Sequence, residues 1–281
     1  MILESPNFLR VSINTIYPPH NTLLFEEFFY QEFVKNNEIT NRIYIPAFWT
    51  SLYVNRNYGH SDLSDIQNFI DNLDRNEKYF TIVQYDDNIL NDFKDLDILI
   101  FAMGGHGKYK DKSYPIPLNC LPPQGLQIIN KDILGSFIGS INGRHIIREK
   151  MTNALKNNNK YIISEHMGYG QFREIMSKST FSLCPRGYGQ TSFRICEALQ
   201  VQSIPVYIYD EPLTPFYDEF DFNDIGILIH ESEIDKIDEI LSSKTSEDIQ
   251  NYVNNGIKIY NQFFDYKGCY ESIIKILNKK K

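Results

Sequence analysis

The sequence predicts an α/β fold made of two doubly wound halves, each built on a parallel sheet. Short apolar runs typical of buried strands alternate with amphipathic stretches whose apolar residues recur at helical spacing. A segment with four prolines and little periodicity interrupts this alternation once, between residues 104 and 134. The 281 residues suffice for two domains. We expect an N-terminal domain at 1–130 and a C-terminal domain at 131–281, whose last helix can return to the first domain.

The first half is expected to be a βαβ series that starts with a strand. Its expected strands lie at 8–16, 42–48, 79–85 and 97–103, and its expected helices at 22–34 and 61–73. Ser61 or Ser64 is placed to cap the second helix, because a serine hydroxyl accepts from the free amides of a first helical turn.

The second half repeats the pattern after the proline-rich segment. Its expected strands lie at 135–140, 160–164, 179–184, 203–209 and 225–230, with helices at 143–156, at 169–178 and after 190. Two further helical stretches, 231–243 and 245–277, complete the chain. In such a sheet, ligands bind outside the carboxyl ends of the strands.

Composition and charge predict a soluble globular protein that does not bind nucleic acid. Hydrophobic residues make up 42% of the chain and charged residues 23%, and the formal net charge of −8 disfavours binding to a polyanion. The four cysteines lie far apart, without the spacing of a metal site or a disulfide scaffold, so we expect buried, reduced thiols. The first residues lack a basic leader, and no window approaches 18 apolar residues. We therefore expect a cytoplasmic protein without a membrane span.

The stretch "CPRGYGQTSFRICEALQ", residues 184–200, has the features of an anion cradle. It follows an expected strand and leads into an expected helix, which places it at the ligand-binding edge of the sheet. Gly187 and Gly189 permit positive φ and close backbone approach, and Thr191 or Ser192 can cap the helix. The amides of the first turn would then face the ligand.

Two charged residues of this helix lie away from its apolar face. On a helical wheel Arg194 and Glu197 point together to the side that Ile195 and Leu199 leave free. The helix dipole disfavours a cation in the first turn by roughly 0.3–1 kcal/mol, so stability alone does not explain Arg194. A phosphate bound between Arg186, Arg194 and the helix N-terminus explains it, and a surface ion pair between Arg194 and Glu197 is the alternative.

The wider segment "KSTFSLCPRGYGQTSFRICEALQVQSIPVYIYDEPLTPF", residues 178–216, resembles the core signature of the exostosin-type glycosyltransferases. Weaker similarity extends over "FIGSINGRHIIREKM" (137–151) and over "FAMGGHG" and "YPIPL" within 101–118. The resemblance implies the GT-B arrangement, in which two Rossmann-like domains face each other across a cleft. It further implies an inverting transfer from a UDP-sugar to a glycan acceptor, with the donor bound by the second domain. Gln202 and Ser203 stand where the family commonly has glycine and cysteine, and the anchor and disulfides of its eukaryotic members have no counterpart in the sequence.

The resemblance also assigns roles to residues of the second half. Glu197 would accept the ribose hydroxyls of the donor. The diphosphate would be held by two arginines and the backbone of the loop between them, namely Arg186, Gly187, Gly189, Thr191, Ser192 and Arg194. Arg144 and Arg148 are further cations for the same group, unless they only form a solvated helix face. Asp210, with Glu211 beside it, could meet sugar hydroxyls.

An inverting transfer also needs a base in the first domain. Asp86, Asp87 and His106 follow strands whose ends face the predicted cleft, and His20 is a fourth candidate; each could equally be a loop residue without a catalytic role. The Asp-x-Asp at 95–97 lies before a strand, away from the cleft, so we expect no metal and no cofactor beyond the UDP-sugar. A catalytically inactive exostosin-like scaffold that binds nucleotide or glycan is the alternative function.

Overall fold

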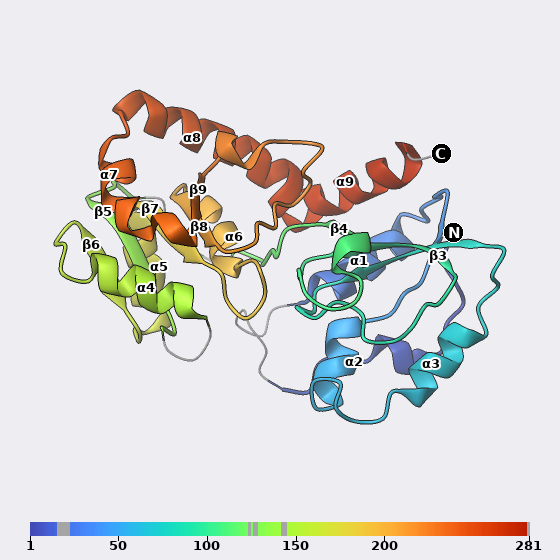
Figure 1. Ribbon diagram of the computed structural model, residues 1–281. Coiled ribbons are helices and arrows are strands. Elements are labelled where there is room, and N and C mark those ends of the chain that lie inside the picture. The colour runs from blue at the N-terminus through green and yellow to red at the C-terminus, as the bar shows by residue number, and fades with distance from the viewer. Residues whose placement is uncertain (16–22, 123–124, 126–128, 142–144, 280–281) are drawn as a thin grey trace. The chain divides into compact units, whose positions relative to one another are not determined.

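The computed structural model describes residues 1–15, 23–122, 125, 129–141 and 145–279. The chain divides into two compact units, which are described separately (Figure 1). Unit 1 comprises Met1–Ile116 and Tyr266–Lys281, and unit 2 comprises Pro117–Asp265. The division falls at Pro117, earlier in the chain than the expected boundary after residue 130. The C-terminal helix groups with unit 1.

Unit 1 is built on a parallel sheet with the strand order β1-β2-β3-β4. Its strands are β1 (Ile43–Tyr44), β2 (Lys78–Val83), β3 (Asp97–Ala102) and β4 (Ser113–Pro115). Its helices are α1 (Phe25–Lys35), α2 (Trp49–Asn55), α3 (Ser64–Asp71) and α9 (Tyr266–Lys279), with short 3-10 helices at Asn7–Arg10 and Lys110–Lys112.

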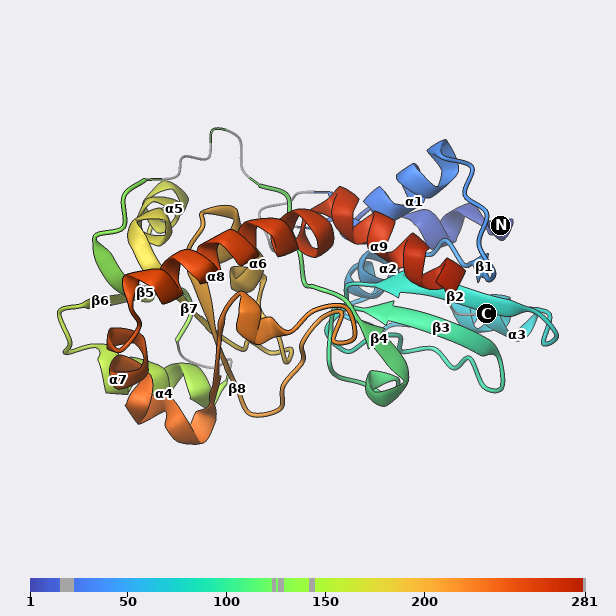
Figure 2. The ribbon, with the colours of Figure 1, turned by 90° about the horizontal axis from the view of Figure 1, so that it is seen from above.

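Both faces of this sheet are covered, because successive strand residues point to opposite sides. On β2, Tyr79 belongs to the core cluster that includes Trp49 of α2 and Ile66 of α3. The next residue, Phe80, lies 6.1 Å from Phe29 of α1 between ring centroids. Helix α9 runs alongside α1, and their rings pack together (Figure 2). Unit 1 is thus a three-layer α/β domain.

Unit 2 contains a second parallel sheet, with the strand order β6-β5-β7-β8-β9. Its strands are β5 (Ile133–Ile138), β6 (Tyr161–Ser164), β7 (Ser179–Pro185), β8 (Ile204–Tyr209) and β9 (Ile227–His230). Its helices are α4 (Ile146–Leu155), α5 (Tyr169–Lys178), α6 (Phe193–Gln200), α7 (Ile237–Ser242) and α8 (Ser246–Ile259), with 3-10 turns at Phe222–Asp224 and Glu231–Lys236 and a π-helix at Tyr260–Phe264.

The order of these strands creates a topological switch point. From β5 the chain first adds β6 on one side and then returns through α5 to add β7 on the other. The carboxyl ends of β5 and β7 therefore lie next to each other with their following segments diverging, which is where doubly wound folds bind ligands. The predicted α/β class, with two parallel-sheet domains, is confirmed.

Several local predictions for unit 1 were wrong. No strand forms at 8–15, because Asn7–Arg10 is a 3-10 helix, and only Leu9 of this turn is buried; residue 16 lies outside the described residues. Neither Ser61 nor Ser64 caps α3, because the Asp62 carboxylate accepts from the Ser64 amide at 2.9 Å. Helix α2 was not anticipated, since its seven residues are too few to show a helical period.

The long helical stretch predicted at 245–277 is interrupted. Helix α8 passes into the π-helix, and the backbone of Asp265 is extended, with φ −63° and ψ 143°. The chain then restarts as α9, so the break coincides with the passage from unit 2 to unit 1.

Candidate donor and catalytic sites

The loop of residues 186–192 joins β7 to α6 at the carboxyl edge of the unit 2 sheet. Ser192 is the cap of α6, because its hydroxyl accepts from the Arg194 amide at 3.3 Å. The Gly187 amide donates to the Thr191 carbonyl at 3.3 Å, which closes the loop on itself. The Tyr207 hydroxyl donates to the carbonyl of Gln190, so a side chain of β8 anchors the loop. The loop is therefore a fixed element at the start of the helix.

The glycines of this region act by close approach, and for Gly187 this corrects the expectation of positive φ. Gly187 is not among the described glycines with positive φ. A Cβ on Gly187 would lie 3.2 Å from Nη2 of Arg148, and one on Gly139 would lie 3.1 Å from Nη2 of Arg194. The missing side chains leave room for two guanidinium groups at the switch point.

The Arg194 guanidinium has few hydrogen-bond partners within the described part of the chain. Its Cζ lies 4.7 Å from the ring centroid of Phe137, the residue before the last of β5, and 5.1 Å from that of Phe172 in α5. Its Nε and Nη1 are shielded from solvent and have no hydrogen-bond partner in the described part of the chain. Burial lowers the pKa of Arg194, against the attraction of Glu197, which raises it. A cation desolvated in this way attracts an anion strongly.

Glu197 does not lie on a free helix face, contrary to the helical wheel. It is 5% exposed, and the residues from Ile195 to Gln200 are all buried. Nη1 of Arg173 lies 3.8 Å from Glu197 Oε1, and Nη2 of Arg173 donates to Gln200 Oε1 at 3.2 Å. Helix α6 also contacts α8 and the π-helix, and α8 packs against Leu199 on the apolar side of the helix. Glu197 is therefore paired with a buried arginine that the sequence analysis missed.

Arg186 and Asp210 form an ion pair across the carboxyl ends of β7 and β8. Nη1 of Arg186 lies 2.5 Å from Asp210 Oδ1, and Nη2 donates to the Tyr188 carbonyl at 3.0 Å. Burial raises the pKa of Asp210, but hydrogen bonds from Arg186 and the Glu211 amide outweigh it and lower the pKa overall. Nε2 of His145 lies 3.3 Å from the other carboxylate oxygen of Asp210. The two residues predicted for separate roles thus act together, with a histidine that was not predicted.

Arg148 belongs to the same site. Its Nε donates to the Arg186 carbonyl at 3.0 Å and its Nη1 to the Ser140 carbonyl at 2.9 Å, so it ties the ends of β5 and β7 together. The alternative of a solvated helix face is wrong for Arg148. Arg144 lies outside the described residues.

In unit 1 the catalytic candidates gather at the carboxyl ends of β2 and β3. Nδ1 of His106 lies 3.7 Å from Asp87 Oδ1, and the His106 amide donates to the Asp86 carbonyl at 3.1 Å. Gly107 has φ +77°, and a Cβ there would lie 2.0 Å from the Asp87 carbonyl oxygen. The two loops therefore touch, and they hold an acid and an imidazole as neighbours. His20 lies outside the described residues.

The Asp-x-Asp at 95–97 lies at the opposite edge of this sheet. Asp97 is the first residue of β3 and pairs with Arg42 at 2.7 Å, and Asp95 lies 3.8 Å from Arg75. Within the described residues no group of three or more potential ligands is arranged to hold a metal ion. Nor do the described helices include one long and apolar enough to cross a membrane.

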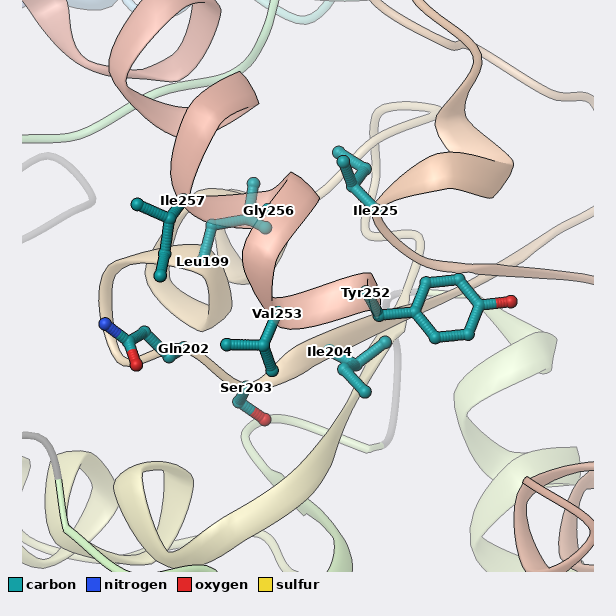
Figure 3. A pocket seen from close by; sticks show the side chains of 9 residues that line it. All are labelled: Leu199, Gln202, Ser203, Ile204, Ile225, Tyr252, Val253, Gly256 and Ile257. Atoms are coloured by element: carbon teal, nitrogen blue, oxygen red, sulfur yellow. The ribbon is translucent and has the colours of Figure 1, made fainter. Parts of the chain in front are cut away.

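A small void in unit 2 lies away from the donor site (Figure 3). Val253, Gly256 and Ile257 of α8 line one side, and Leu199 of α6 and Ile204 at the start of β8 line the other. A Cβ on Gly256 would lie 3.2 Å from Leu199 Cδ2. The void lies in the packing interface between α6, α8 and the start of β8, at the amino edge of the sheet.

Two parallel-sheet units, one with an arginine-rich switch point, define a doubly wound ligand-binding protein. Residues 106–244 match the Exostosin GT47 domain family. This confirms the resemblance seen in the sequence. The matched residues include the entire loop from Arg186 to Ser192, helix α6 and the Arg186–Asp210 pair.

The relatives that the chain resembles are glycosyltransferases. It is 36% identical over 103 residues to a probable glucuronosyltransferase of Oryza sativa subsp. japonica, with 36% of this chain and 23% of the relative covered. It is 36% identical over 76 residues to a probable beta-1,4-xylosyltransferase of Arabidopsis thaliana, with 27% of this chain and 18% of the relative covered. The chain therefore spans less than a quarter of the length of either relative.

Solved structures give a more distant comparison. An alpha-glucosyltransferase in complex with UDP and a 13-mer DNA is 13% identical, with a TM-score of 0.46 and coverage of 89% of this chain and 84% of that chain.

Proposed function

We propose that the protein is an inverting glycosyltransferase that moves a sugar from a UDP-sugar to a hydroxyl group of a glycan acceptor. The match to the Exostosin GT47 domain family supports glycosyl transfer. The single observation that carries the donor assignment is the Arg194 guanidinium, which lies at the switch point with two shielded nitrogens that lack hydrogen-bond partners among the described residues. A diphosphate would supply the acceptor oxygens that these groups lack.

The donor would be held by side chains of unit 2 with distinct tasks. Arg194 and the first-turn amides of α6 would neutralise the charge that develops on the leaving UDP. Arg148 would keep the loop in place through the Arg186 carbonyl. Glu197 would accept the ribose hydroxyls, with its own charge balanced by Arg173. Fixed cations would then do the work that a metal ion does elsewhere, so transfer would proceed without a divalent metal.

The acceptor proton would go to the Asp87–His106 pair of unit 1. In a single displacement the acceptor hydroxyl oxygen attacks the anomeric carbon and its proton passes to the base, while the bond to the UDP oxygen breaks with its electron pair. Either Asp87 itself or His106, oriented by Asp87, can take that proton. Asp86 contributes its carbonyl to the position of the His106 loop.

The test is UDP release from a panel of UDP-sugars by the purified protein, with and without EDTA. We expect turnover with at least one donor, unchanged by EDTA and lost by tenfold or more in Arg194→Ala. Arg75→Ala is the matched control, because Arg75 is ion-paired with Asp95 in unit 1, at the edge of the sheet opposite to Asp87 and His106. Tight UDP binding without turnover of any donor would instead favour the inactive scaffold. If EDTA abolished turnover, metal-free stabilisation of the leaving group would be wrong.

A further inference from the structure

Unit 2 contains a second concave site, separate from the arginine cluster, between the end of β8 and the edge strand β9. Its cavity volume is about 600 Å³, which is within the range of ligand pockets. Aromatic and acidic side chains dominate its walls, together with Pro212, Thr214 and Leu228. We refer to it as the 209–228 hollow.

The walls of the hollow are fixed before any ligand binds. Phe216 is fully buried at φ 49°, a conformation that costs a bulky residue roughly 1–3 kcal/mol, and its ring lies 4.9 Å from that of Phe263. The ring of Phe220 lies 5.1 Å from the same Phe263. The Leu213 amide donates to the Tyr207 hydroxyl at 3.2 Å, which anchors the start of the loop. A loop anchored at its start and packed through two of its rings is a preformed surface.

This anchoring leaves an aromatic side chain directed outward beside the hollow. Tyr217 directly follows buried Phe216 and is 61% exposed, an unusual exposure for so large a ring. Tyr209 lines the hollow from the last position of β8, where its ring lies 5.2 Å from that of Tyr207. Flat rings with a polar hydroxyl suit a ligand that offers both C–H faces and hydroxyl groups.

The charge of the hollow restricts its ligand further. Asp218, Glu219 and Asp221 line it, and its described lining includes no lysine, arginine or histidine. Carboxylates accept strong hydrogen bonds from hydroxyl donors, but they repel a carboxylate on the ligand. From these two properties we propose that the 209–228 hollow is a subsite for an uncharged stretch of the acceptor glycan, and that it disfavours glycans rich in uronic acid. The role of the bound glycan as acceptor rests on the proposed transferase function, whereas glycan binding in the hollow does not.

Isothermal titration of the full chain with xylohexaose and with hexagalacturonate tests the subsite without any donor. We expect xylohexaose to bind at least tenfold more tightly than hexagalacturonate. Tyr217→Ala should weaken xylohexaose binding about tenfold, whereas Tyr217→Phe should keep it within twofold because the ring remains. Tyr58→Ala is the matched control, since Tyr58 is an exposed tyrosine of unit 1.

Two further results complete the test. Combining Asp218→Asn with Glu219→Gln should improve hexagalacturonate binding at least threefold, because the repelling charges are removed. The proposal would be overturned if the two glycans bound with equal affinity or if xylohexaose did not bind. It would also be overturned if Tyr217→Ala, with an unchanged melting temperature, bound xylohexaose as tightly as the wild type. Xylohexaose binding at Tyr217 without UDP release from any donor would leave the subsite standing and refute the transferase function, and the reverse pattern would refute the subsite alone.

Discussion

Two arginines of unit 2 lie in contrasting surroundings, so replacing one by methionine should weaken UDP binding and replacing the other should lower stability. Arg194 stacks between two rings, but two of its shielded nitrogens have no hydrogen-bond partner in the part of the chain that the structure describes. Arg173 pairs with Glu197 and donates to Gln200. Methionine keeps the unbranched apolar stem of each side chain and removes the guanidinium group with its charge and donors.

For Arg194→Met the two effects on stability nearly cancel. Loss of the cation–π contacts with Phe137 and Phe172 costs about 1–2 kcal/mol. Removal of two shielded nitrogens without partners among the described residues raises the free energy of unfolding by about 1–3 kcal/mol. The free energy of unfolding should therefore change by no more than about 1 kcal/mol, whereas loss of a charge-assisted bond to phosphate should raise the Kd of UDP by about tenfold to a hundredfold.

For Arg173→Met the stability itself should fall. Glu197, 5% exposed, would be left as a buried carboxylate without its recorded ion-pair partner. Breaking a buried pair costs about 3–5 kcal/mol, and the 3.8 Å separation places this pair at the lower end. A loss of that size lowers the melting temperature of a domain by several degrees.

Thermal unfolding with and without UDP, combined with titration calorimetry, measures both quantities for both variants. The expected pattern is unchanged stability with weak UDP binding for Arg194→Met, and lowered stability for Arg173→Met. If Arg194→Met unfolded several degrees earlier and bound UDP normally, Arg194 would be a structural residue and the donor site would lie elsewhere.

Three more predictions concern other parts of the site and fold. Glu197→Gln should raise the Kd of UDP about tenfold but leave that of 2′-deoxy-UDP within twofold; equal losses for the two nucleotides would contradict the ribose role. Asp87→Asn should lower turnover roughly 10²–10⁴-fold with the Kd of UDP unchanged, and a fully active variant would exclude Asp87 as base. Burial raises the pKa of Glu26 to about 8, against the lowering effect of its hydrogen bonds with Gln84 and Thr50. Because the folded state keeps this proton while the unfolded chain loses it near its ordinary pKa, the melting temperature should fall as the pH rises from about 4.5 to about 8, and Glu26→Gln should flatten that fall. A wild-type curve no steeper than that of the variant would contradict the buried, protonated state.

The donor loop could be predicted from the sequence because its signals are local. A strand, a glycine-containing turn and a helix cap follow one another within residues 179–200, and the structure places them as a strand, a loop and a helix capped by Ser192. The shared edge of Asp87 and His106 also followed from strand order alone, because parallel strands end at one edge. The loop features depend only on neighbours in the chain, and the shared edge depends only on the parallel direction of the two strands.

The partners of the charged residues could not be predicted, because they come from distant segments. A helical wheel assumes that polar positions face solvent, so it assigned Glu197 to an exposed face of the helix. The structure instead places Arg173 of α5 beside Glu197, and the whole of β7 separates α5 from α6 in the chain. One sequence signal was available: Arg173 lies between the buried residues Phe172 and Met176 of α5, and an arginine in a buried stripe needs a partner.

The switch point explains why the cations collect where they do. Phe137 and Gly139 arrive from β5, Arg148 from α4, and Arg194 from the segment after β7, and these segments meet only because the chain adds β6 on one side of β5 and β7 on the other. Gly139 leaves room for the Arg194 guanidinium, and Phe137 covers one face of it. A single exchange, Gly139→Ala, would push a methyl group to within 3.1 Å of Arg194 Nη2 without removing any charge. If the position of this guanidinium determines donor binding, that exchange should weaken UDP binding although every arginine is still present.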